Sequence, residues 1–469
     1  HFVAQWFPKL ARLLPNGSFE HFAFHPQSEF AANFGSYDVT LDAPSSHVLG
    51  ATGSCETAPS SSGRRALRCR ASDVHDFAWT SWPHFRQRDE RMGGVAVRVL
   101  YPPGNEGNAE LELDTVRYGL QHFEQRFGPY PYPTLTVVHP PEPAANSGGM
   151  EYPTLITTGG PWFTRWSGAR AIETVTIHEL GHQWFYGVLA SDEHRFPFLD
   201  EGLTSYAEHS ALSARYGASS AFSGLGLQIS HEALSRSVAA ARGADEPIAQ
   251  GAAEFFSFRS LGAIVYSRTA TVLSTLERVY GKQQLDLALA DYAGAARFRH
   301  PEPPQLLEAI RARLGEAAAR NLSRALFERG NVDYLVREVQ SAASDPRAGV
   351  FDDGPSRQTV PRNEVRPPPR WAGHAVVLRH GSLEFPVQIE LSFADGSRQR
   401  RDWNGEGSRY TVRYEGSSRL VGVSVDPERR VLLDDDLTNN SASIEDQGVP
   451  RSLERLSYWF QLLLAGGLP

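Results

Sequence analysis

The chain has 469 residues and a formal net charge of −8, which argues against nucleic acid as a partner because a phosphate-binding face needs a basic excess. Its length is enough for about three domains with large buried cores, and 41% hydrophobic with 21% charged residues is typical of a globular protein. No apolar run reaches the roughly 18 residues that span a bilayer, and the longest, 458–468, is better interpreted as part of an amphipathic tail helix.

Residues 1–94 are expected to form β-structure. Alternating apolar residues predict strands at 37–41 and 66–71, and Ser, Gly and Arg residues at 60–65 indicate a turn between them. These strands are too few to close a sandwich. We therefore expect the segment to be the second half of a β-domain whose first half is missing from this chain.

The two cysteines, Cys55 and Cys69, are fourteen positions apart on strands that the pattern predicts to face each other. They can form a cross-strand disulfide, or they can remain two buried thiols, and the spacing does not choose between these states. A disulfide would favour an oxidising compartment, the periplasm or the outside of the cell, over the cytoplasm.

The segment 95–330 is expected to be one α+β domain. A strand at 95–100, a helix at 111–127 and a buried strand at 135–138 come first, and the pattern from 169 onward is almost wholly helical. Further helices are expected at 221–242, 258–280, 285–296 and 305–328. A small β-lobe followed by a helical lobe is typical of α+β domains.

The last part of the chain, 331–445, is predicted to be a small β-sandwich that includes a Pro-, Asp-, Arg- and Gly-rich linker at 342–370. Residues 446–469 are predicted to be a helical tail. The expected fold class is therefore multidomain α+β: a partial N-terminal β-domain, an α+β domain, and a C-terminal β-sandwich with a terminal helix.

The sequence at 178–182 reads His-Glu-Leu-Gly-His. Two histidines four positions apart on a helix project from the same face and can bind one metal ion. Eighteen residues separate His182 from Glu201, which opens a second predicted helix and offers a carboxylate. Two histidines and a glutamate leave a fourth position open for water, as in catalytic zinc sites, so we predict one Zn²⁺ per chain held by His178, His182 and Glu201.

Three further side chains fit hydrolytic chemistry. Glu179, next to the first histidine, is placed to take a proton from water and pass it to a leaving amine. Glu208 follows Glu201 by two helical turns, where it either orients a histidine ligand or is a plain surface carboxylate. Tyr266 lies in an apolar helix, and the residue pattern alone favours a buried structural tyrosine.

The His-Glu-x-x-His motif, the glutamate after eighteen residues, and Gly-Gly-Met-Glu at 148–151 together resemble the M1 family of zinc aminopeptidases, the gluzincins related to leukotriene A4 hydrolase. Segments 5–8, 29–30, 37–39 and 74–79 are similar to bacterial members, so the resemblance covers most of the chain. It implies a thermolysin-like catalytic domain and hydrolysis of the N-terminal peptide bond of a peptide substrate.

The resemblance also implies residue roles. By it, Glu179 is the general base, and Tyr266, sixty-five residues after Glu201, matches the tyrosine that stabilises the oxyanion. Glu151 matches the glutamate that binds the substrate's free α-amino group. An ion pair between this carboxylate and the ammonium would fix the position of the substrate's N-terminus and so give exopeptidase action. The edge strand along which the peptide backbone lies is matched by Gly148, Gly149 and Met150.

The chain departs from the family pattern at three places. Tyr152 replaces the usual Asn after the Met-Glu pair, and Arg268-Thr269 replaces Lys-Gly after the tyrosine. The family's N-terminal β-domain also begins well before the segment that matches His1, and Gln5 is the nearest candidate for its second amine anchor. The missing part is expected to be trimmed away or to remain as a separate, associated fragment.

The leading hypothesis is thus a bacterial zinc aminopeptidase, periplasmic or secreted. One alternative is an endopeptidase or another zinc hydrolase, such as an epoxide hydrolase, on the same scaffold. A second alternative is a non-catalytic interaction scaffold. The presence of ligands, base and tyrosine together argues against the scaffold, because a scaffold needs none of them.

Overall fold

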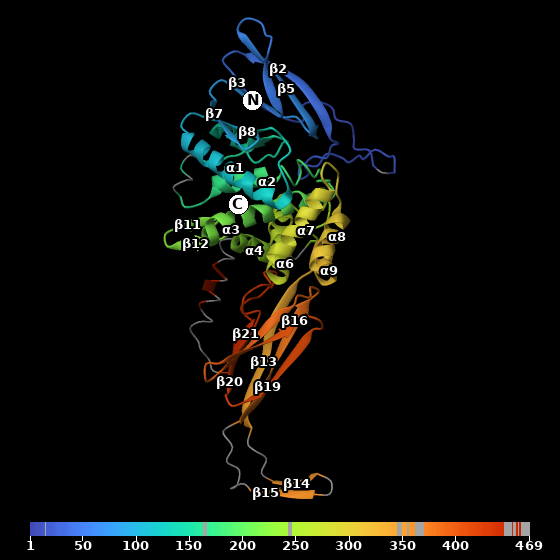
Figure 1. The fold of residues 1–469 in the computed structure, drawn as a ribbon, viewed down its shortest axis with the longest axis vertical. Coiled ribbons are helices and arrows are strands. Elements are labelled where there is room, and N and C mark those ends of the chain that lie inside the picture. The colour runs from blue at the N-terminus through green and yellow to red at the C-terminus, as the bar shows by residue number, and fades with distance from the viewer. Residues whose placement is uncertain are drawn as a thin grey trace. The chain divides into compact units, whose positions relative to one another are not determined.

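The computed structural model forms two compact units, residues 1–328 and 329–469 (Figure 1). It describes residues 1–14, 16–161, 163, 167–242, 246–344, 349–353, 356–361, 370–444, 453, 456–457 and 459–460. The predicted helical tail at 446–469 lies largely outside these described residues. Within them, no helix is long and apolar enough to cross a membrane.

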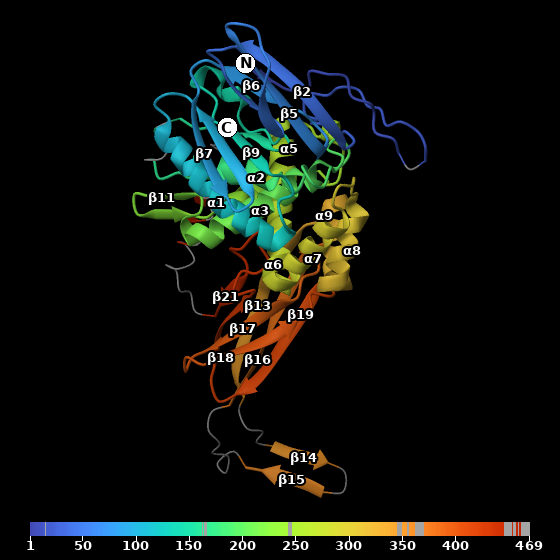
Figure 2. The same cartoon turned by 45° about the horizontal axis from the view of Figure 1, so that its top comes forward.

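The first unit begins with two small antiparallel sheets (Figure 2). One has the order β1 (Phe2–Val3), β6 (Trp79–Trp82), β3 (Val48–Ala51), and the other has the order β2 (Gly35–Pro44), β5 (Arg64–Val74), β4 (Ser54–Ala58). Leu41, Leu49 and Phe77 belong to the buried cluster between these strands. Alternate burial along β2 explains why its apolar residues recur at every second position.

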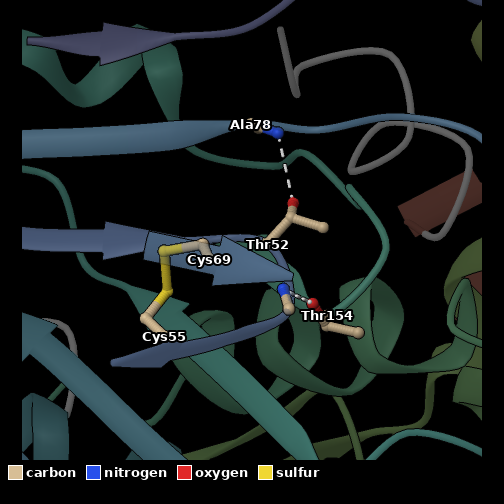
Figure 3. Close-up of a disulfide and its surroundings, with 6 residues drawn as sticks. Thr52, Cys55, Cys69, Ala78 and Thr154 are labelled. Carbon is tan, nitrogen blue, oxygen red and sulfur yellow. Dashed lines mark hydrogen bonds between the residues drawn. A yellow bond between two sulfur atoms is a disulfide. The ribbon is translucent and has the colours of Figure 1, made fainter. Parts of the chain in front are cut away.

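A disulfide joins Cys55 on β4 to Cys69, its direct partner on β5 (Figure 3). Close to it, the Gly53 amide donates to Thr154 Oγ1 at 2.7 Å and the Ala78 amide donates to Thr52 Oγ1 at 3.1 Å. The bond to Thr154 connects this β-region to the segment that follows Glu151. Of the two states that the sequence left open, the structure has the bonded one.

A third sheet has the order β10 (Leu155–Thr157), β9 (Thr134–Val138), β8 (Val95–Tyr101), β7 (Arg86–Met92). Strands β8, β9 and β10 run parallel, and β7 pairs antiparallel at the edge. Helix α1 (Glu106–Phe127) connects β8 to β9, which is the connection that parallel neighbours require. Consecutive buried residues along β9 agree with a strand covered on both faces.

The helical part of this unit follows. Its helices are α2 (Ala171–Gly181), α3 (Glu201–Tyr216), α4 (His231–Arg242), α5 (Phe258–Leu261), the π-helix η6 (Gly262–Arg268), α6 (Thr269–Tyr280), α7 (Lys282–Ala295), α8 (Pro303–Leu314) and α9 (Glu316–Phe327). Short 3₁₀ turns lie at η1 (Glu142–Ser147), η3 (Pro197–Leu199), η4 (Gly217–Ser219) and η5 (Ala252–Glu254).

Two helix predictions need correction. Part of the expected helix 221–242 is the hairpin of β11 (Phe222–Gly224) and β12 (Leu227–Ile229), because positive φ angles of 53° at Leu225 and 77° at Gly226 turn the chain. The expected helix 305–328 is two helices, because Gly315 has a φ of 92° and ends α8.

Two larger sheets lie among the described residues of the second unit. One has the order β13 (Val332–Ser344), β16 (Arg370–Gly381), β19 (Arg409–Gly416), and the other has the order β18 (Arg398–Trp403), β17 (Val387–Phe393), β20 (Leu420–Val425), β21 (Ser441–Ser443). Tyr334 packs edge-on against Trp403, and Phe393 packs edge-on against Tyr414, so aromatic rings join the sheets. Within the expected linker 342–370, β14 (Gly349–Asp353) pairs with β15 (Ser356–Val360).

Candidate metal centre

The candidate ligands come from two consecutive helices. His178 and His182 lie at the C-terminal end of α2, and Glu201 is the first residue of α3. His178 Nε2 lies 3.0 Å from Glu201 Oε2, and His182 Nε2 lies 3.2 Å from the same oxygen. The three side chains offer donor atoms that all lie within 4.8 Å of one another. Two imidazole nitrogens and one carboxylate oxygen are the donor set of a catalytic zinc site.

Each histidine is oriented through its other nitrogen. His178 Nδ1 lies 2.9 Å from Glu208 Oε2, and His182 Nδ1 lies 2.5 Å from Asp200 Oδ1. Carboxylates in this position fix the ring and the tautomer, so that both Nε2 atoms face the metal position. Glu208 therefore contacts a histidine in the structure. Asp200 was missed in the sequence, although it directly precedes Glu201.

Burial shapes the electrostatics of this centre. Burial lowers the pKa of His178, but hydrogen bonds with Glu201 and Glu208 outweigh it and raise that pKa to about 10. Burial opposes ionisation of Glu201 as well, yet the two histidines hold its pKa well below the usual range. A metal ion therefore competes with protons for the histidine nitrogens, and its binding depends on pH.

Glu179 points its carboxylate into a buried space. It is 5% exposed, and no described group donates a hydrogen bond to its Oε2. Burial raises the pKa of Glu179 to about 7, although His178 and His182 act in the opposite direction. This carboxylate can therefore exchange a proton near neutral pH.

Tyr266 lies on the π-helix η6 beside the ligands. Its hydroxyl donates to Glu201 Oε1 at 2.5 Å, and its ring stacks on His178 with centroids 6.0 Å apart. Burial and the nearby Glu201 carboxylate raise the pKa of Tyr266 well above its ordinary value, so the hydroxyl stays protonated. π-Helical turns are rare in proteins, and many of those that occur lie at functional sites.

The segment 148–150 runs past Glu179. A Cβ on Gly149, which has a φ of 74°, would lie 3.8 Å from Glu179 Oε1, and a Cβ on Gly148 would lie only 2.3 Å from the Thr158 carbonyl oxygen. Both positions therefore need glycine. Met150 forms a single antiparallel bridge with Thr157, so the expected edge strand is reduced to one pair beside β10.

Glu151 is held by a residue that the sequence did not single out. Gln183 Nε2 donates to the Glu151 carbonyl oxygen at 3.1 Å and to that of Tyr152 at 3.2 Å, and its Oε1 accepts from the Thr154 amide at 2.8 Å. Gln183 directly follows His182. Adjacent residues thus supply a candidate metal ligand, His182, and hold the backbone of Glu151 in place through Gln183.

Glu29 lies next to Glu151. Burial, followed by the charge of Glu201, raises the pKa of Glu29 to about 8. Burial and Glu29 likewise raise the pKa of Glu151 well above its ordinary value. Gln5, the sequence candidate for a second amine anchor, donates its side-chain amide to Asp76 instead.

Comparison with known proteins gives a consistent result. Residues 111–328 match the model of the peptidase family M1 domain. The chain is 24% identical over 231 residues to aminopeptidase M1-B of Oryza sativa subsp. japonica, covering 48% of this chain and 26% of the rice protein. It is 26% identical over 216 residues to human aminopeptidase N, covering 43% of this chain and 22% of the human protein. The chain thus spans about a quarter of the length of these relatives.

A solved structure shares the fold over nearly the whole chain. It is Legionella pneumophila aminopeptidase A in complex with aspartic acid, with a TM-score of 0.63 and 14% identity. The match covers 93% of this chain and 49% of that one. The family resemblance seen in the sequence is confirmed over residues 111–328, which match the peptidase family M1 domain.

Proposed function

We propose that the protein is a zinc-dependent aminopeptidase that removes the N-terminal residue of a peptide. One observation carries this proposal: the donor atoms of His178, His182 and Glu201 converge within 4.8 Å, next to the buried carboxylate of Glu179. The curated relatives named aminopeptidases support the same reaction class.

The chemistry divides between the metal and the chain. Zinc in such a site lowers the pKa of a coordinated water to about 7 and polarises a carbonyl group. Glu179 accepts a proton from the attacking water and delivers it to the leaving amine. A pKa raised to about 7 suits a group that must both take and release a proton near neutral pH.

Tyr266 is proposed to stabilise the transition state. Its hydroxyl lies 2.5 Å from Glu201 Oε1 and stays protonated, so it can donate to the oxygen on which negative charge develops. A hydroxyl fixed in a buried site needs no reorganisation when that charge appears, which is the source of its effect on rate.

Glu151 is proposed to bind the substrate's α-ammonium group. The carboxylate is 3% exposed, and Gln183 holds its backbone. A charged hydrogen bond to the ammonium places the first peptide bond, and no later one, at the metal. The segment Gly148–Met150 is proposed to lie along the substrate backbone between the ammonium group at Glu151 and the peptide bond at the metal.

Paired substrates test this proposal. The zinc-loaded protein should hydrolyse an aminoacyl-arylamide and should lose that activity when the substrate's amino group is acetylated. Cleavage of blocked peptides at a similar rate would instead indicate an endopeptidase. A zinc-loaded protein that cleaves neither substrate would indicate a non-catalytic scaffold.

Substitution of the base gives the first prediction. Glu179→Gln should keep about one zinc per chain and lose turnover by about 10²–10⁴-fold, the usual contribution of a positioned base. Glu173→Gln is the matched control, because Glu173 is buried on the same helix and pairs with Arg170. Near-normal turnover of Glu179→Gln would contradict the role of this residue.

A further inference from the structure

Four carboxylates gather beside the candidate metal centre. They come from separate parts of the first unit: the segment before β2, the segment before β10, the loop after α2, and the residue before α3. They are Glu29, Glu151, Glu193 and Asp200, and one oxygen of each lies within 4.8 Å of one oxygen of every other. Glu151, Glu193 and Asp200 are at most 3% exposed.

The hydrogen bonds around this acidic cluster are incomplete. Glu193 Oε2 accepts from the Phe30 amide at 2.6 Å, and Asp200 Oδ1 is bonded to His182. Each of the four carboxylates keeps one buried oxygen that has no donor among the described residues. Glu29 and Glu151 bring two acceptor oxygens within 4.8 Å of each other, and two acceptors satisfy one another only if a proton or a cation lies between them.

The charge of the acidic cluster is also uncompensated. In the part of the chain that the structure describes, no lysine or arginine forms an ion pair with any of its four members. Burying several carboxylates without a counter-charge is costly, because both desolvation and mutual repulsion act against ionisation. Both effects raise the pKa of Glu193 well above its ordinary value. A bound cation would supply the counter-charge that these residues lack and would favour their ionised form.

We infer that the acidic cluster is a second cation site, which binds a hard divalent cation such as Mn²⁺ or Ca²⁺ separately from the His178, His182 and Glu201 centre. Its donors are all carboxylate oxygens, which hard cations prefer, whereas the other centre has imidazole nitrogens, which suit zinc. Oxygens at about 2.1–2.5 Å from one ion are separated by at most about 5 Å, in agreement with the observed clustering.

Because the cation would bind the Glu151 carboxylate, it would compete with the substrate's α-ammonium group for that carboxylate. This part of the inference rests on the proposed function, since it requires Glu151 to bind the amine. A divalent ion neutralises two of the carboxylate charges and an ammonium neutralises one. The ion should therefore raise KM and leave kcat unchanged.

Titration of the zinc-loaded protein with Mn²⁺, followed by the electron paramagnetic resonance signal of free Mn²⁺, tests the site directly. The wild type should bind about one Mn²⁺ while its zinc content stays constant. Glu193→Gln should weaken this binding by about tenfold or more, since it removes one of four charged ligands. The glutamine can still accept from the Phe30 amide, so the variant should fold.

Glu246→Gln is the matched control. Glu246 is a buried glutamate, but its Oε1 accepts from Ser260 and its Oε2 accepts from Gln250 and Phe256. This variant should bind Mn²⁺ like the wild type. The inference would be overturned if the wild type bound no Mn²⁺ at millimolar concentration, or if Glu193→Gln bound Mn²⁺ as tightly as the wild type. Neither measurement depends on catalytic activity.

Kinetics then test the overlap with the amine. Mn²⁺ should raise the KM of the wild type for an aminoacyl-arylamide, and Glu193→Gln should resist this effect. Inhibition that lowers kcat alone would overturn the competition at Glu151. If the protein cleaves no arylamide, the proposed function fails while the binding experiment still decides whether the site exists.

Discussion

At the scale of single residues, the centre depends on side chains that hold each other in place. Tyr266 contacts two of the three candidate ligands, through a hydrogen bond to Glu201 and ring stacking on His178. Glu208 contacts the Nδ1 atom of the same histidine. The candidate zinc ligands thus fix the position of the Tyr266 hydroxyl, which is proposed to act together with the zinc ion.

Tyr266→Phe should lower kcat by about 10²–10³-fold with little change in KM, since the hydroxyl is proposed to act only on the developing oxyanion. Tyr206→Phe is the control, because the Tyr206 hydroxyl, like that of Tyr266, donates to a carboxylate, that of Glu277 at 2.6 Å. Steady-state kinetics of both variants would decide. A rise in KM alone for Tyr266→Phe would assign the hydroxyl to substrate binding.

The sequence predicted the part of the centre that is local. The spacing of His178 and His182 follows from helical geometry, and Glu179 lies between them. Asp200, Gln183 and the acidic cluster could not be predicted, because tertiary folding brings them together from distant segments. The role of Tyr266 came from family resemblance, since its own pattern indicated a core tyrosine.

At the scale of elements, the centre depends on how closely α3 approaches η6. A Cβ on Gly202 would lie 2.5 Å from Thr269 Cγ2 and 2.8 Å from the Val265 carbonyl oxygen. Glycine at this position lets Glu201 and Tyr266, which lie on these two elements, come within hydrogen-bond distance. The sequence predicted one continuous helix over 258–280 and gave no sign that 262–268 would be a π-helix.

Gly202→Ala should destabilise the protein by about 1–3 kcal/mol, the usual cost of overpacking, and should weaken zinc binding by displacing Glu201. Gly294→Ala on α7 is the control, since nothing lies within 4 Å of its added Cβ. That change should leave zinc binding intact and stabilise the helix by up to about 1 kcal/mol. Unchanged zinc affinity in Gly202→Ala would show that this approach is not required.

At the scale of the whole molecule, the structure forms two compact units, residues 1–328 and 329–469. In the second unit, strands β16, β17, β19 and β20 were predicted from alternating apolar residues and turn residues. The hairpin β14–β15 was not, because its stretch has the composition of a linker. The Cys55–Cys69 bond was left open because spacing alone does not fix which strand faces which.

The second unit should lose stability as pH rises. Burial raises the pKa of Asp434 to about 8, compared with an ordinary value near 4. Between these values the folded unit binds a proton that the unfolded chain has released, so the free energy of unfolding falls from about pH 4 to pH 8. Asp434→Asn should flatten this dependence. Hydrogen exchange of peptides from β13, measured from pH 5 to pH 9 and corrected for intrinsic exchange, would give the change of the unfolding free energy with pH. Equal pH dependence in the wild type and in Asp434→Asn would exclude Asp434 as its cause.

The central claim is that two helices bring three side chains to one zinc ion. Anomalous scattering at the zinc edge from crystals of the zinc-loaded protein tests it most directly. We predict the strongest peak at about 2.0–2.2 Å from His178 Nε2, His182 Nε2 and a Glu201 carboxylate oxygen. No peak at that position, or zinc bound only by other residues, would contradict the account.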